Sequence, residues 1–243
     1  MTLEWHYNNG YVDISMPEHV KEALHQLQHR APKKPVHAAH QWKVIQYGRN
    51  NQQPNEDETS PKLGPDGRKH IQRITGKFLY YARAIDHTML VALNELGRQQ
   101  ANPTEKTLEA TTMLLDYAAT HPNAKLRFTT SDMVLHINTD AAFLVQPQAK
   151  SRVAGYYFMR SEIVNNVDPE TKLNAPILAK IKTLRYIVGS AAEAEIGGLY
   201  TRGQTAVPIR QALVEMNHSQ PAIPIKTDVL DCHHETKDVQ VDR

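Results

Sequence analysis

Three carboxylates in the second half of the chain combine the residue type and the position that a divalent metal site needs. Asp140 and Asp228 each end a segment that is typical of a β-strand, and Glu195 lies one turn inside an expected helix. Carboxylate oxygens are hard donors of the kind that Mg²⁺ prefers. Two Mg²⁺ ions held by shared carboxylates activate water and stabilise the leaving oxygen in phosphodiester hydrolysis. On spacing alone, however, acids at such positions are more often solvated or capping residues.

The elements that must position these acids are expected to be strands and one helix. Beyond residue 121 apolar and polar residues alternate with a period of two, and later segments are rich in Tyr, Ile and Val. A helix is expected after Gly189 and Ser190, with a kink or a restart at Pro208. The expected strands are 126–128, 133–140, 153–160, 182–188 and 222–226.

The first half of the chain is predicted to be helical on either side of a connection. An amphipathic stripe predicts one short helix within residues 16–29. Residues 31–68 are polar and rich in Pro, so they are expected to form a linker. Three helices are expected over 70–121, with a break near Asp86. For the third, Asn102 is the expected N-cap, followed by Pro103 and the capping acid Glu105.

Composition limits the class of protein. A formal net charge of +2 is far below that of a dedicated nucleic-acid coat protein, so phosphate contacts would have to come from local patches. The single cysteine, Cys232, excludes an internal disulfide. No segment has the length and hydrophobicity of a membrane span, so no membrane partner is expected. We expect an intracellular protein, cytoplasmic or nuclear and not secreted.

Three stretches follow one another in the second half of the chain: HINTDAAFLVQPQAKSRVAGYYFM, LRYIVGSAAEAEIGGLY and PAIPIKTD. In this order they resemble the ribonuclease H domain of LTR-retrotransposon Pol polyproteins of the copia type. Upstream, residues 70–122 resemble the helical connection of these transposable elements, and YVDISMPEHVKEAL resembles the end of their reverse transcriptase. The resemblance covers nearly all of residues 10–228.

This resemblance implies an α/β fold, with a ribonuclease H-like mixed sheet and flanking helices preceded by a small helical connection subdomain. The implied organisation is a tail of the reverse transcriptase over 1–30, a linker over 31–68, the connection over 69–123, and a C-terminally truncated ribonuclease H-like domain over 124–243.

The resemblance also implies the site. The family's metal-binding acids fall on Asp140, Glu195 and Asp228, with Glu195 preferred to Glu193 because an apolar residue follows it directly. The implied activity is hydrolysis of the RNA strand of an RNA–DNA hybrid by two Mg²⁺ ions. The partners would be the hybrid, recognised by its shape and 2′-hydroxyls, and other parts of a retroelement polyprotein. Two basic residues shortly after Asp140 are candidate phosphate contacts, or else a solvated basic turn: Lys150 and Arg152.

The chain departs from the family after Asp228. The family continues into a helix with a fourth metal-binding aspartate, which Asp231 and Asp238 are not expected to replace. A nuclease that lacks this acid would be weakened or inactive. The alternative is a non-catalytic structural or nucleic-acid-binding remnant of the polyprotein. The related integrase branch requires a different spacing of acids, and the sequence Glu193-Ala194-Glu195 argues against it.

Other residues with chemical potential have plainer interpretations. Cys232, His233 and His234 could ligate zinc, but a terminal tail is the preferred interpretation. His37 and His40 are expected to be exposed polar residues rather than ligands. Five aromatic residues could stack on bases but are expected to belong to the core: Tyr80, Tyr81, Tyr156, Tyr157 and Phe158.

Overall fold

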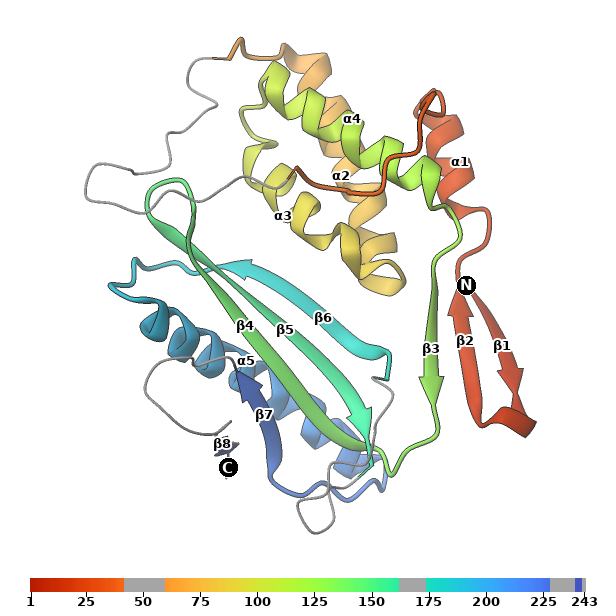
Figure 1. The fold of residues 1–243 in the computed structure, drawn as a ribbon, viewed down its shortest axis with the longest axis vertical. Helices are drawn as coiled ribbons and strands as arrows, with labels where there is room; N and C mark the ends of the chain where they lie inside the picture. The colour runs from red at the N-terminus through yellow and green to blue at the C-terminus, as the bar shows by residue number, and fades with distance from the viewer. Residues whose placement is uncertain (42–59, 162–173, 228–238, 242–243) are drawn as a thin grey trace. The chain divides into compact units, whose positions relative to one another are not determined.

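The computed structural model describes residues 1–41, 60–161, 174–227 and 239–241, which form a mixed α/β fold (Figure 1). The chain divides into two compact units. The first, here the helical unit, comprises Met1–Trp5 and Asp13–Leu126, and the second, here the sheet unit, comprises His6–Val12 and Arg127–Arg243. No helix in the described ranges is long and apolar enough to cross a membrane.

The helical unit contains four α-helices, as far as its described residues show. They are α1 (His19–Gln26), α2 (Pro65–Ala84), α3 (Leu90–Gln99) and α4 (Glu105–Thr120). The helix α2 begins with a proline in its first turn, where the missing N–H costs nothing. The prediction of a linker up to residue 68 is therefore wrong by one helical turn.

The N-cap predicted for α4 is also wrong. Asn102 donates its backbone N–H to Gln99 O and so belongs to the turn that closes α3. Thr104 is the N-cap instead. Its hydroxyl accepts the N–H of Thr107 at 3.4 Å, and the Thr107 hydroxyl accepts the N–H of Thr104 at 3.0 Å, so two threonines form the capping box.

A three-stranded sheet has the order β1-β2-β3, and the sequence predicted only one of its strands, the one at 126–128. Its strands are β1 (Thr2–His6), β2 (Tyr11–Ser15) and β3 (Lys125–Thr129). The β1–β2 hairpin turns through a short 3₁₀ segment and Gly10, whose φ of 64° lies in the left-handed region that favours glycine.

The sheet unit is built on a five-stranded sheet of order β6-β5-β4-β7-β8. Neighbouring strands are antiparallel except for β4 and β7, which are parallel. Helix α5 (Ala191–Glu215) lies between β6 and β7 in the chain and covers one face of the sheet (Figure 1). The strands are β4 (Val134–Gln146), β5 (Lys150–Arg160), β6 (Pro176–Thr183), β7 (Ile223–Thr227) and β8 (Val239–Val241).

Three sequence predictions for this unit need correction. Strand β4 does not end at Asp140 but continues to Gln146, because its pairing with β5 continues. The strand expected at 182–188 lies at 176–183, and the apolar residues Leu184 and Val188, which follow it, pack with Ala194 of α5. Of the two alternatives for Pro208, the restart is wrong, since α5 runs through it, and the kink stays a prediction.

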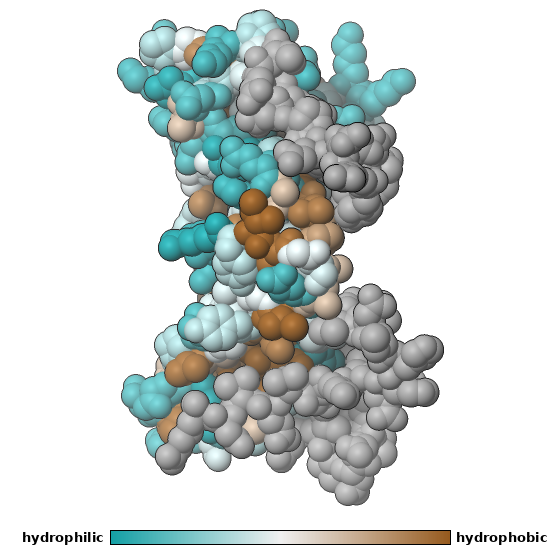
Figure 2. Space-filling model, turned by 90° about the vertical axis from the view of Figure 1, so that its left-hand side faces the viewer, coloured by the Kyte–Doolittle hydropathy of each residue, from teal (hydrophilic) through white to brown (hydrophobic). Residues whose placement is uncertain are grey.

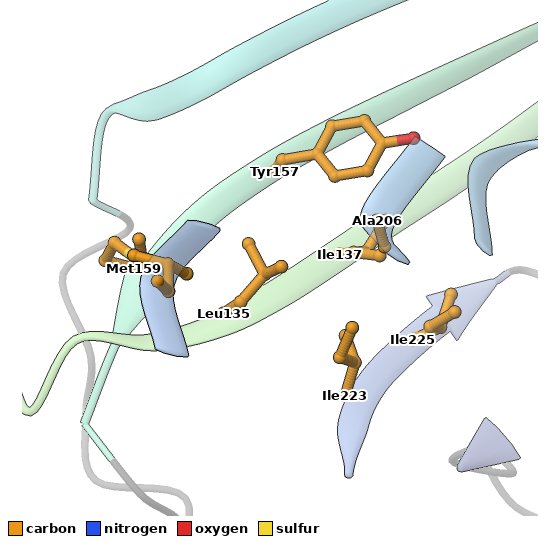
Figure 3. Packing of buried hydrophobic residues seen from close by; sticks show 8 residues of the cluster. Leu135, Ile137, Tyr157, Met159, Ala206, Ile223 and Ile225 are labelled. Carbon is orange, nitrogen blue, oxygen red and sulfur yellow. The ribbon is translucent and has the colours of Figure 1, made fainter. Parts of the chain in front are cut away.

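The core between α5 and the sheet explains the alternation in β4. Leu135 and Ile137 point toward α5 together with Ile223 and Ile225 of β7, as Figure 3 shows. Successive side chains of a strand point to opposite faces, so the odd-numbered residues of β4 up to Ala141 form the helix-facing side of the sheet. The even-numbered residues form the opposite face.

Apolar side chains also reach the surface, where hydrophobic residues gather between hydrophilic ones (Figure 2). On α5 these include Ile196, Tyr200 and Val207. Among the aromatic residues predicted to lie in the core, Tyr81, Tyr157 and Phe158 are buried and Tyr156 is partly buried, but Tyr80 is 58% exposed.

Candidate functional site

The register of β4 and β7 pairs the two residues that directly precede acids singled out by the sequence. Thr139 pairs with Thr227 at the last rung of the parallel ladder. Asp140 directly follows Thr139, and Asp228 directly follows Thr227. Asp228 itself lies outside the described residues, so two of the three predicted acids can be placed.

Glu195 reaches this end of the ladder from α5. Its side chain is buried, and its two oxygens have different partners. Oε1 accepts the backbone N–H of Ala141 at 2.9 Å, and Oε2 accepts the hydroxyl hydrogen of Thr227 at 2.8 Å. One donor is thus the residue after Asp140, and the other is the residue before Asp228.

A close approach of α5 to the sheet permits these bonds. Gly198 lies one helical turn after Glu195, and a Cβ added to it would meet Thr139 Oγ1 at 3.3 Å and Val153 Cγ1 at 3.4 Å. A larger side chain there would have to displace β4 or β5. The small residue therefore sets the distance at which the Glu195 carboxylate meets β4.

Glu193 and Glu195 have different surroundings. Glu193 is exposed and belongs to the helix start: its N–H donates to Ser190 Oγ at 3.1 Å, and its Oε2 accepts the N–H of Gly189 at 2.6 Å. This differs from a capping box only in that Glu193 accepts the N–H of Gly189, which precedes the N-cap Ser190. Glu195 is the acid that faces the sheet, while its role as a metal ligand stays a prediction.

Asp140 is exposed and belongs to the opposite face of the sheet. Its neighbours Thr139 and Ala141 both belong to the helix-facing side, because Thr139 lies against Gly198 and Ala141 packs with Val153 and Ala194. In the described residues, the link between Glu195 and Asp140 therefore runs through the backbone N–H of Ala141.

The two candidate phosphate contacts lie in a strand rather than in the basic turn considered as their alternative. Lys150 begins β5, and Arg152 pairs with Ala142 of β4. Directly paired residues share a face of the sheet. Arg152 is therefore on the same face as Asp140, on the neighbouring strand.

Arg202 is a buried cation that the sequence did not single out. It is 1% exposed, its Nη2 donates to Val153 O at 3.3 Å, and its backbone oxygen accepts the hydroxyl hydrogen of Tyr157 at 3.0 Å. Burial lowers the pKa of the Arg202 guanidinium below its ordinary value. Arg202 follows Glu195 at the i+7 position, two helical turns later, so both side chains lie on the sheet-facing side of α5.

A second cluster that could hold a metal ion lies on the β1–β2 hairpin and was not predicted. Ligand atoms of Glu4, His6 and Asp13 all lie within 4.8 Å of one another. Glu4 already forms an ion pair with Lys125 at 2.9 Å, which supplies a protein cation in place of a metal ion. This pairing makes the trio a weak candidate.

His37 and His40, which the sequence predicts to be exposed polar residues, belong to no three-residue group that could hold a metal ion among the described residues. His37 shares a hydrogen bond of 3.1 Å with His121. The tail with Cys232, His233 and His234 lies outside the described residues, as do Asp231 and Asp238.

Comparisons of the chain with protein-family models, with curated proteins and with solved structures find no match.

Proposed function

We propose that the sheet unit is a ribonuclease H-like domain that hydrolyses the RNA strand of RNA–DNA hybrids with Mg²⁺. The topology supports this proposal. Three consecutive antiparallel strands, β4 to β6, are followed by helix α5 and by β7, which returns to pair in parallel with β4. A mixed sheet with a helix on one face is what the resemblance to the ribonuclease H domain implies.

The observation that carries the proposal is the pair of hydrogen bonds to Glu195. A buried carboxylate on α5 bonds to the residue after Asp140 and to the residue before Asp228. The three acids are far apart in sequence; Asp140 lies on β4 and Glu195 on α5, and Asp228 directly follows β7 in the sequence. If these acids were only capping or solvated residues, a buried glutamate would not be expected at the end of the pairing between β4 and β7.

The donor set fits Mg²⁺ by its chemistry. All three predicted ligands are carboxylates, and each ionised carboxylate oxygen has two lone pairs, so Glu195 could accept a metal ion beside its two hydrogen bonds. Bound Mg²⁺ would supply an activated water and charge stabilisation at the leaving oxygen. Thr227 and the Ala141 amide would hold Glu195 in place, and Asp140 would supply a second, exposed carboxylate.

The test is cleavage of a hybrid that carries labelled RNA, in Mg²⁺, by the whole chain and three variants. Asp140→Asn and Glu195→Gln should abolish cleavage, since each removes a metal-binding charge at nearly constant shape. Glu193→Gln is the matched control two residues away, and it should retain cleavage because Glu193 caps the helix. No cleavage by the native chain, or cleavage that survives Asp140→Asn, would refute the proposal.

One observation favours the rival function, a non-catalytic structural or nucleic-acid-binding module. Both oxygens of Glu195 have protein donors, while Asp140 belongs to the other face of the sheet. If Glu195 is purely structural, Glu195→Gln should change stability, and the native chain should bind the hybrid without cleaving it.

A further inference from the structure

The face of the sheet that carries Asp140 changes along β4 from buried to open. At the start of the strand, Val134 is 6% and His136 is 3% exposed. Two pleats further, Asn138 is partly exposed and Asp140 is exposed. A ligand that approaches this face can therefore reach the end of β4 that carries Asp140.

The register brings two basic residues to this open region from different strands. Lys226 of β7 pairs with Asn138, and Arg152 of β5 pairs with Ala142. Each basic residue is thus diagonal to Asp140, on opposite sides of it along β4. Strands about 4.8 Å apart with a rise of about 3.3 Å per residue put each Cα about 8 Å from that of Asp140. The Lys226 side chain is long enough to reach a group above Asp140. Arg152 can reach it by leaving Gln146, whose side-chain amide lies 3.3 Å from Arg152 Nε and Nη2.

We infer that Lys226 and Arg152 contact the two phosphates that flank a central phosphodiester of a nucleic-acid backbone and hold this central phosphodiester over Asp140. This inference rests on the proposed function for its ligand, an RNA–DNA hybrid. Cations fix the position of a nucleic acid without reading its sequence, and an arginine can bind a phosphate through two parallel hydrogen bonds.

The charge balance of the chain makes these two basic residues necessary for binding. A net charge of +2 provides no general attraction for a polyanion, and Asp140 itself repels phosphate. Binding at this face therefore needs local positive charge, and Lys226 and Arg152 are placed to supply it from both sides.

The same sheet offers a matched control. Lys182 of β6 is exposed and pairs with Val153, which belongs to the helix-facing side. Lys182 therefore has the same charge on the same sheet but not on the face of Asp140.

The experiment measures the Kd of a fluorescein-labelled RNA–DNA hybrid across a series of salt concentrations, in EDTA so that no metal-dependent cleavage occurs. Each phosphate contact contributes about 0.9 to the slope of log K against log salt. Lys226→Gln and Arg152→Gln should each lower the slope by about 1 and weaken binding at every salt concentration. Lys226→Arg should retain the slope, and Lys182→Gln should behave as the native chain. Asp140→Asn should tighten binding, because a repelling charge is removed.

The inference is overturned if Lys226→Gln and Arg152→Gln leave the slope unchanged, or if Lys182→Gln lowers it equally. Thermal unfolding of each variant excludes loss of fold as the cause, and Lys226→Arg gives a second check because it keeps the charge. Failure of the nuclease proposal has a different signature: the slopes change as expected, but the hybrid stays intact in Mg²⁺.

Discussion

The hydroxyl of Thr227 donates a 2.8 Å hydrogen bond to Glu195 Oε2, which ties β7 to α5 at the residue that precedes Asp228. The acceptor is buried, so water cannot readily replace a lost donor. Loss of this bond should therefore lower the stability of the sheet unit.

Thr227→Val should destabilise the sheet unit by about 1.5–3 kcal/mol, because a buried carboxylate loses a charged hydrogen bond while the side-chain shape is kept. Urea unfolding followed by circular dichroism measures the loss. Thr227→Ser keeps the hydroxyl and should recover most of the stability. Equal losses in the two variants would show that the methyl group of Thr227, not its hydrogen bond, is what matters.

A second prediction concerns the space that Gly155 leaves for Arg202. A Cβ at Gly155 would lie 2.5 Å from Cδ and 3.1 Å from Cγ of Arg202. Gly155→Ala should therefore cost about 1–3 kcal/mol through overpacking. Gly76→Ala in α2 is the control, since nothing lies within 4 Å of its added Cβ, and it should gain about 0.5–1 kcal/mol as a helix-interior glycine is replaced.

A double-mutant cycle assigns the cost. In the background Arg202→Ala, the change Gly155→Ala should lose most of its effect, because the clashing side chain is gone. A cost that is the same in both backgrounds would place the clash elsewhere, for instance at Tyr157 Cε2, which lies 3.1 Å from the added Cβ.

The sequence could predict elements whose burial has a clear period. The helices α2, α3 and α4 were expected, because each has a regular apolar stripe against the core, as at Ile71, Ile74 and Phe78 of α2. The alternation at Leu135 and Ile137 likewise predicted β4. Strand β1 gave no such signal, because its residues Thr2–Trp5 are all exposed.

The parts of the site that sequence could not supply depend on register and packing. The sequence preferred Glu195 to Glu193 only through a resemblance; the physical reason that Glu195 faces the sheet is the helix phase that Ser190 sets as N-cap. The placement of Lys226 beside Asn138 follows from the parallel register with β7, which no local pattern encodes. Arg202 interrupts an apolar helix face, and only the missing side chain of Gly155, on another element, makes room for it.

Alkaline pH should destabilise the helical unit through Tyr81. Burial raises the pKa of Tyr81 from its ordinary value of 10.0 to about 12. The folded state thus keeps a proton that the unfolded chain releases. This contribution to stability is fully present below about pH 10 and is lost as the pH rises through about 12, at about 1.36 kcal/mol per pKa unit.

Urea unfolding at steps between about pH 9 and pH 12 measures this loss. Tyr81→Phe lacks the phenol, so its stability should fall less steeply over this range than that of the native chain. Tyr80→Phe is the control, because Tyr80 is 58% exposed. Parallel stability curves for the native chain and Tyr81→Phe would contradict the prediction.

The N-cap of α4 is Thr104 in the structure, whereas the sequence predicted Asn102, and mutation of each residue can distinguish the two. Thr104 is 1% exposed, and its hydroxyl accepts the N–H of Thr107, which has no partner within the first turn of a helix. Thr104→Ala should therefore cost about 1 kcal/mol in urea unfolding. Asn102→Ala should stay within about 0.5 kcal/mol of the native chain, because Asn102 contributes its backbone to the turn after α3. The reverse order of the two losses would restore Asn102 as the residue that begins the helix.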